Sequence, residues 1–291
     1  MKLMNLKTFI LLFVYCFADA LQCPPRENIT PCMCLEQNNN LHMHCSIILS
    51  VTQLQSAVQG MRGYKFTTFN IDKSNFEYIP STIFEDISIE KLTISKSNFS
   101  RIANLLEPQF KGLENSLKTL VFIETFSEKE PLPYLALEHL SKLQTLEFRK
   151  SYVGTVHNLW FKEGPSSLRD VRFVESHLQN VGYTAFQSLK NLRIIDLSDN
   201  QIDYVARASF PDPASHLEEI NLQRNALTCL EEDTFKDMPK LSRVNLELNE
   251  ISTLDEKVWS SVWSHLQYLQ IDCKFVFFYF SFNSYVIHIF L

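Results

Sequence analysis

Glycine and proline are scarce in this chain, with 6 and 11 copies in 291 residues. Flexible linkers are built largely from glycine, serine and proline, so no linker between independent domains is visible. Charge of one sign does not dominate either, because the formal net charge is −6 and no basic stripe interrupts the sequence. Binding of nucleic acid through its phosphates is therefore not expected.

Catalytic motifs are also missing. The sequence has no G-x-S-x-G, no H-E-x-x-H, no P-loop and no dinucleotide-binding fingerprint. The histidines in the body of the chain are scattered and indicate no acid–base cluster: His139, His157, His177, His216 and His265. We therefore expect a protein that is not an enzyme and that holds no cofactor and no metal.

What the sequence does contain is an apolar pattern repeated from Phe66 to Cys273. In each copy an apolar residue is followed at +3 and +5 by two more, and successive copies begin 23 to 28 residues apart. The nine copies begin at Phe66, Ile89, Leu117, Leu143, Leu168, Leu192, Leu217, Leu241 and Leu266. This period and this trio are typical of a leucine-rich-repeat solenoid.

The trio explains why the units must stack. The +3 and +5 residues share one face of a strand, because strand side chains alternate between faces. A unit of about 25 residues buries too little apolar surface to offset the entropy lost on ordering it. We therefore expect an α/β solenoid with a curved parallel sheet on the concave side and a mostly irregular or short helical convex side.

Two further columns follow the same register. At +8 the residues are small and polar, and we expect them to form an internal hydrogen-bond ladder, weaker where serine replaces asparagine: Ser74, Ser97, Thr125, Ser151, Ser176, Asn200, Asn225 and Asn249. At +18 the residues are aromatic and should stack inside the convex wall: Phe84, Phe161, Phe186, Phe210, Phe235 and Trp259.

The amino terminus has the features of a secretory signal peptide over residues 1–20. Lys2 and Lys7 precede an apolar run over residues 9–17, and Ala18-Asp19-Ala20 places small residues at a cleavage site. Cleavage there would remove Cys16 and leave six cysteines, an even number suited to an oxidising compartment. We therefore expect a secreted, extracellular protein.

Residues 21–65 are expected to form an amino-terminal cap that leads into the repeats. Four cysteines cluster there with C-x8-C-x-C-x10-C spacing: Cys23, Cys32, Cys34 and Cys45. Four cysteines allow three pairings, and the spacing does not choose among them. The alternative is a zinc site with His42 and His44, but structural zinc sites separate paired cysteines by two or more residues.

The repeat array is expected to span residues 66–273, followed by an apolar tail at 274–291. The last 17 residues contain no Asp, Glu, Lys or Arg, and a membrane helix needs about 20 apolar residues. Three interpretations of the tail stay open: an aberrant or truncated terminus, a membrane or lipid-anchor signal, and a packed end cap. The pairing of Cys229 and Cys273 is open too.

Two glycosylation sequons support an extracellular location. They are Asn28-Ile29-Thr30 in the cap and Asn98-Phe99-Ser100 beside the +8 column. A turn position next to the ladder should point Asn98 outward, which favours its modification.

The solvent side of the sheet is the expected binding surface, because curvature makes it concave and continuous. Its +4 and +6 positions combine apolar residues and arginines at the centre with an acidic region after them. The expected partner is an extracellular protein or peptide, and the contact residues are Val121, Ile123, Glu147, Arg149, Arg172, Val174, Asp196, Glu219 and Glu247. An ordinary solvated sheet face is the alternative.

The cap sequence C-P-P-R-E-N-I-T-P-C-M-C, the repeats and the phenylalanine column together carry a family resemblance. The chain resembles arthropod secreted leucine-rich-repeat proteins, the group similar to the oplophorus-luciferin 2-monooxygenase non-catalytic subunit. More distantly, it resembles receptor ectodomains of the Toll and Slit type. The resemblance implies a non-catalytic, secreted partner protein, with an accessory subunit of a monooxygenase complex or a membrane-anchored receptor fragment as alternatives. It also implies disulfides Cys23–Cys34 and Cys32–Cys45.

The aromatic column generates the first testable prediction. Phe186→Ala should lower the free energy of unfolding by about 3–5 kcal/mol, because it leaves a cavity in the shared interior. Urea denaturation measures this loss. A loss below about 1 kcal/mol would place the side chain at the surface and contradict the assignment.

Overall fold

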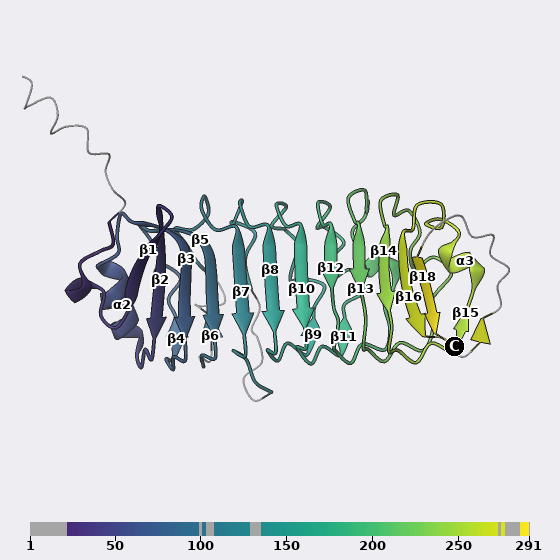
Figure 1. The fold of residues 1–291 in the computed structure, drawn as a ribbon, viewed down its shortest axis with the longest axis horizontal. Coiled ribbons are helices and arrows are strands. Elements are labelled where there is room, and N and C mark those ends of the chain that lie inside the picture. Colours follow the sequence, from purple (N-terminus) through teal and green to yellow (C-terminus); the bar gives the residue numbers. More distant parts are fainter. Residues whose placement is uncertain are drawn as a thin grey trace, which may run out of the picture.

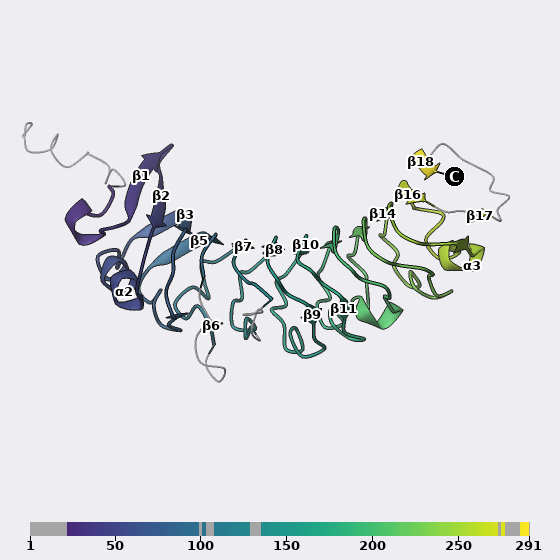
Figure 2. The same ribbon diagram turned by 90° about the horizontal axis from the view of Figure 1, so that it is seen from below.

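The structure is a computed structural model that describes residues 22–98, 101–102, 108–128, 135–272, 275–276 and 286–290. The chain winds into an elongated coil that curves along its length (Figures 1 and 2). The predicted signal peptide at 1–20 lies outside the described residues, as do Cys273 and most of the tail.

A twelve-stranded sheet lines the concave side of the curve (Figure 2). Its first two strands form an antiparallel hairpin, and each later strand pairs in parallel with the one before it in the sheet. In order, the strands are β1 (Met33–Gln37), β2 (Asn40–Ser46), β3 (Lys65–Asp72), β5 (Ser88–Ser95), β7 (Thr119–Ile123), β8 (Thr145–Arg149), β10 (Asp170–Val174), β12 (Ile194–Asp196), β13 (Glu219–Asn221), β14 (Arg243–Leu246), β16 (Tyr268–Asp272) and β18 (Val286–Phe290).

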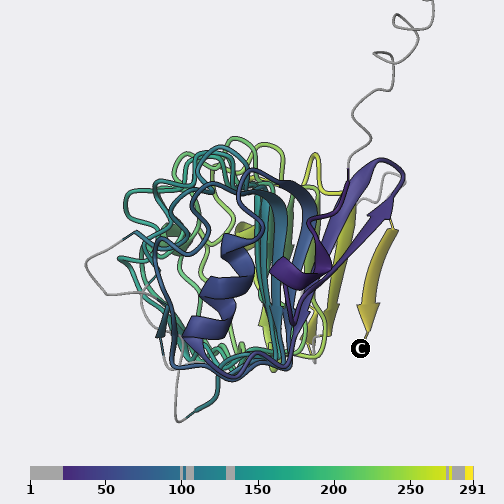
Figure 3. The ribbon, with the colours of Figure 1, turned by 90° about the vertical axis from the view of Figure 1, so that its left-hand side faces the viewer.

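In the described ranges the convex side carries only short elements, as the repeat pattern predicts. Helix α2 (Val51–Gln59) is capped by Ser50, whose side chain accepts a hydrogen bond from the Gln53 amide, and the helix buries Leu54, Ala57 and Val58. Figure 3, seen from the amino-terminal end, shows α2 on the side of the coil away from the sheet. The other short elements are α3 (Glu256–Trp259), two 3-10 turns at Arg26–Asn28 and Arg207–Ser209, and the parallel pairs β4 (Tyr78–Ile79) with β6 (Arg101–Ile102), β9 (Thr155–Val156) with β11 (Asn180–Val181), and β15 (Thr253–Leu254) with β17 (Phe275–Val276).

The strand trio forms the core, which confirms the repeat register. Every +3 and +5 side chain is at most 1% exposed, including Leu197, Leu222 and Leu246 in successive turns. These side chains all belong to one hydrophobic cluster that runs from the cap to the last repeat, so no turn has a core of its own. The array therefore holds together only through its neighbours.

The predicted aromatic column is buried as well. Its six members are at most 2% exposed. In the second repeat Phe110 takes the corresponding place, with its ring centroid 6.2 Å from that of Phe84. In the middle of the array the +5 residues of the predicted trio are aromatic as well, and Phe122, Phe148 and Phe173 stack with centroids 4.9 and 5.1 Å apart.

The +8 ladder is confirmed by its hydrogen bonds. The Asn225 side-chain oxygen accepts from the Ile202 amide at 3.0 Å, and its nitrogen donates to the carbonyls of Leu197 and Leu222. One side chain thus makes two bonds to the previous turn and one within its own, and Asn249 repeats the arrangement. In the front half Ser97 makes two bonds, accepting from the Ser74 amide and donating to the Ser95 carbonyl.

The residue before each ladder position bends the chain out of the strand. At +7 the backbone is left-handed in the first eight repeats and at the equivalent cap position, with φ between 47° and 58° at Ile47, Lys73, Lys96, Glu124, Lys150, Glu175, Asp199, Arg224 and Leu248. None of these residues is glycine, so the sequence offers no signal for the bend. The conformation aims the +8 side chain back into the coil.

Two disulfides cross-link the cap internally. They join Cys23 to Cys34 and Cys32 to Cys45, which is the pairing that the family resemblance implies. Strand β2 of the cap already lies in the repeat register, because its His44 pairs with Asn70 of β3. Among the described residues, Cys229 is a free cysteine and is exposed.

The described part of the tail adds to the far end of the sheet. Strand β18 pairs in parallel with β16 over five residues. No helix within the described ranges is long and apolar enough to cross a membrane.

The ladder generates a prediction about where the coil is strongest. Asn225→Ala should lower the free energy of unfolding by about 2–4 kcal/mol, because it strips buried backbone groups of their partners. Ser97→Ala should cost only about 1 kcal/mol, since fewer bonds are lost. Urea midpoints with unchanged m-values provide the comparison, and the exposed Gln201→Ala is a control. A larger cost for Ser97→Ala would contradict the ladder ranking.

Candidate binding face

The concave face is a regular lattice of side chains set by the strand register. Its central row contains the +4 residues, each paired with the next across the sheet from Asn70 to Gln270. Neighbouring strands lie about 4.8 Å apart, so adjacent members of a row are within contact distance. The face is therefore continuous over all the repeats.

The predicted arginines of this face are paired with acids. The Arg149 guanidinium contacts the Glu147 carboxylate on its own strand at 2.5 Å. The Arg172 guanidinium lies 3.6 Å from the Asp196 carboxylate on the next strand, and its position in the row is between Glu147 and Asp196. These arginines therefore act first as neutralising partners within the sheet.

The acids after the centre are also held by partners, one of which is a neutral amide. The Glu219 carboxylate lies 3.2 Å from the Arg243 guanidinium, and the Glu247 carboxylate accepts a hydrogen bond from the Gln223 side chain at 2.8 Å. Asp196 also accepts from the amide and hydroxyl of Ser198. A ligand that approaches here meets charges whose partners already hold them in place.

The apolar centre is smaller than the sequence suggests. Ile123 and Val174 are half-buried and accessible from the solvent side. Val121 is only 5% exposed, so the side chain adds little to the surface on which the sequence placed it. Of the predicted apolar residues at the centre of the face, a ligand can thus reach mainly Ile123 and Val174. Arg149 lies between them in the +6 row.

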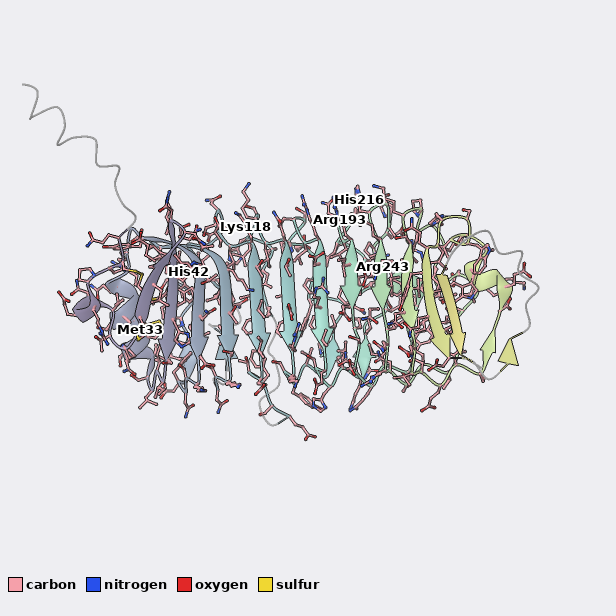
Figure 4. The ribbon with its side chains drawn as sticks, viewed as in Figure 1. Met33, His42, Lys118, Arg193, His216 and Arg243 are labelled. Atoms are coloured by element: carbon pink, nitrogen blue, oxygen red, sulfur yellow. A yellow bond between two sulfur atoms is a disulfide. The ribbon has the colours of Figure 1, made fainter. Side chains whose placement is uncertain are left out.

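Sequence reasoning overlooked most of the +2 row, which faces the same way. Arg243 lies over the Tyr268 ring, 5.4 Å from its centroid, and adds a cation–π contact to its pairing with Glu219. Alternate residues of a strand share a face, so the +2 residue lies on the same face as +4 and +6, and this row could have been predicted from the sequence. Figure 4 shows Arg243 on the open face of the sheet.

The cap extends the face by one hairpin. Met33 and Leu35 of β1 are 50% and 60% exposed and pair with His44 and His42 of β2. The His42 ring nitrogen Nδ1 and the Thr68 hydroxyl share a hydrogen bond of 2.9 Å. The cap sequence did not reveal these two apolar residues, because the +4 row was counted only from Asn70. Figure 4 shows Met33 and His42 at the amino-terminal end of the sheet.

The remaining candidate sites are separate from this face. The sequon residues Asn28 and Asn98 are both exposed, whereas Phe99 and Ser100 lie outside the described residues. Across the ranges that the structure describes, no group of three or more His, Cys, Asp or Glu residues is placed to hold a metal. The shifted acid–base groups also lie elsewhere: burial lowers the pKa of His139, and a hydrogen bond to Glu231 raises the pKa of Tyr204.

The pairing of Arg172 generates a prediction about the free protein. Arg172→Glu would place three carboxylates side by side in the +4 row, which should lower the free energy of unfolding by about 1–2 kcal/mol. The loss should shrink as salt is added, because salt screens partly exposed charges.

Urea denaturation at low and high salt measures this effect. Arg62→Glu, which breaks an exposed pair with Asp86 at 4.0 Å, is the matched control and should change stability little. Equal, salt-independent losses in both variants would show that the Arg172 pair has no stabilising role.

Comparison with known proteins agrees with this architecture. Residues 215–273 match the family model described as leucine rich repeat. The chain is 22% identical over 253 residues to the oplophorus-luciferin 2-monooxygenase non-catalytic subunit of Oplophorus gracilirostris. The aligned part covers 81% of this chain and 68% of that relative.

Solved structures share the fold at lower identity. A complex of TLR13 with ssRNA13 contains a chain that is 20% identical, with a TM-score of 0.66, over 80% of this chain and 31% of that one. The Toll–Spatzle complex of Drosophila gives 16% identity and a TM-score of 0.53, over 86% of this chain and 40% of that one. This chain thus spans less than half the length of either. The stacked turns, the matching family model and these folds identify the chain as a leucine-rich-repeat protein.

Proposed function

We propose that the chain is a secreted, non-catalytic scaffold that binds an extracellular protein or peptide on its concave face. The observation that carries this proposal is the preformed face itself, in which the apolar pair Ile123 and Val174 is surrounded by charges already fixed by partners. Fixed side chains lose little entropy when a partner binds. An apolar centre with a polar rim is also the usual anatomy of a protein interface.

The charges of the face favour a peptide over a phosphate polymer. Its arginines are paired with carboxylates, and acidic residues alternate with them along the rows. A polyanion would meet Glu147, Asp196, Glu219 and Glu247 on the same surface. A peptide that carries both signs of charge can exchange partners with these pairs.

Several features support placing this binding outside the cell. The two cap disulfides are of the kind that persists in oxidising compartments. The amino-terminal sequence has signal-peptide features, and both sequon residues, Asn28 and Asn98, are exposed. We include glycosylation at these two residues in the proposal.

A second candidate function is an accessory subunit of a secreted monooxygenase complex. It is favoured by the likeness to a relative whose name is a non-catalytic subunit. A third candidate, a membrane-anchored receptor fragment, depends on the apolar tail. Cells that retain the full chain but release residues 1–274 would favour the third candidate.

Affinity capture from extracellular fluid tests the proposed face. The purified chain should retain a specific protein, and Ile123→Gln with Val174→Gln should weaken that binding by roughly tenfold or more, as loss of a central apolar contact does. Leu159→Gln with Tyr183→Gln is the matched control. These convex-side residues are 61% and 63% exposed, so the control removes apolar surface elsewhere.

The identity of the captured protein separates the candidates. A captured oxygenase would support the accessory subunit, and any other protein would support a general scaffold. If the control variant loses the partner and the concave variant keeps it, the concave face is not the binding surface. Unchanged urea midpoints would show that both variants remain folded.

A further inference from the structure

A second surface with a different charge lies on the edge of the coil, where the chain enters the strands. Lys142, Arg169, Arg193 and His216 are exposed there, and we call them the basic edge. They line a shallow hollow of about 350 Å³. Figure 4 shows Arg193 and His216 together on this edge, with Lys118 farther along it.

The fold alone brings these residues together. Arg169 and Arg193 occupy the +1 position of successive turns, immediately before β10 and β12, and the Arg193 amide donates to the Arg169 carbonyl at 2.7 Å. Lys142 and His216 precede the repeat starts Leu143 and Leu217 by one residue. These four residues spread over 75 positions of the sequence, from 142 to 216, which is why no basic stripe is visible there.

The positive charges of the basic edge are unpaired, in contrast to those of the concave face. Within the described residues, Lys142, Arg169 and Arg193 form no ion pair, whereas Arg149, Arg172 and Arg243 each contact a carboxylate. No carboxylate lines the hollow. Acidic residues flank the basic edge on both sides. On one side Glu90 pairs with Lys118 at 3.1 Å, and on the other Glu218 takes the equivalent position in the turn after that of Arg193.

The rest of the hollow is polar and not aromatic. It is completed by Ser141, Gln144, Ser167 and Asn191. The Asn191 amide is held by the Ser166 carbonyl at 2.8 Å, and the Ser167 hydroxyl by the Leu143 carbonyl at 2.7 Å. This lining suits a ligand that carries hydroxyl groups as well as negative charge.

We propose that the basic edge binds a sulfated polysaccharide. Arginine side chains recognise oxyanions through charge-assisted hydrogen bonds. The equivalent positions of Arg169 and Arg193 in adjacent turns are about 4.8 Å apart, and Lys142 and His216 belong to the turns on either side, so successive sulfate groups can meet successive cations. Single-stranded nucleic acid is disfavoured, because its binding sites add aromatic rings on which bases stack. This proposal is independent of the concave-face partner.

Heparin tests the basic edge. The full chain should bind immobilised heparin at physiological salt and should not bind heparin stripped of its sulfates. Arg169→Gln with Arg193→Gln should weaken binding by about tenfold, since two charge-assisted contacts are lost. Arg62→Gln with Arg224→Gln removes the same number of charges from arginines that are 58% and 60% exposed, and it should bind like the unaltered chain.

Three results would overturn the proposal. The first is failure of the unaltered chain to bind heparin, and the second is an equal loss in both double variants, which would indicate a diffuse charge effect. The third is tighter binding of single-stranded polyribonucleotide than of heparin. Calorimetric titration with heparin in solution, together with urea midpoints, separates lost binding from lost folding.

Discussion

Every turn of this coil depends on its neighbours for its interior. The side chains of the apolar trio are almost fully buried, and they form one hydrophobic cluster shared by all the turns. The same dependence holds for the backbone, because Asn225 supplies the hydrogen-bond partner of an amide in the previous turn. A core built this way has no centre, and its stability is the sum of interfaces between turns.

That constraint explains the two ends. An end turn lacks a neighbour and would expose its apolar face and an open strand edge. At the amino terminus the β1–β2 hairpin occupies this place, and the disulfides Cys23–Cys34 and Cys32–Cys45 hold it. At the other end β18 pairs with β16 and continues the sheet by one strand.

The shared interior restricts only the inward-facing side chains. The outward-facing residues can therefore differ from turn to turn, and they form two distinct surfaces. On the concave face Arg172 is held by Asp196, so the charge of this arginine is balanced, and the apolar pair Ile123 and Val174 is what distinguishes the surface. On the basic edge Arg169 and Arg193 have no such partners among the residues that the structure describes. A protein that carries both surfaces could hold a protein partner and a polyanion at the same time.

Much of the fold could be read from the sequence because its signals are local and periodic. The repeat starts, the +8 ladder and the +18 aromatics each recur at one spacing, and burial follows spacing when strands alternate. The place of Phe110 in the aromatic column was not predicted, because the second repeat is longer than the others. The left-handed backbone at +7 was not predicted either, because the residues in that column are not glycine, the usual marker of this conformation.

The binding surfaces were less accessible to such reasoning. The sequence by itself determined which residues face outward, including Arg149, Arg172 and Glu219. Only the tertiary structure decided which of them remain available, because ion pairing and burial depend on contacts between turns that are some 25 residues apart in sequence. Stacking neutralised Arg172, covered Val121 and gathered Arg169 and Arg193 into one cluster, and none of these outcomes is encoded within a single repeat.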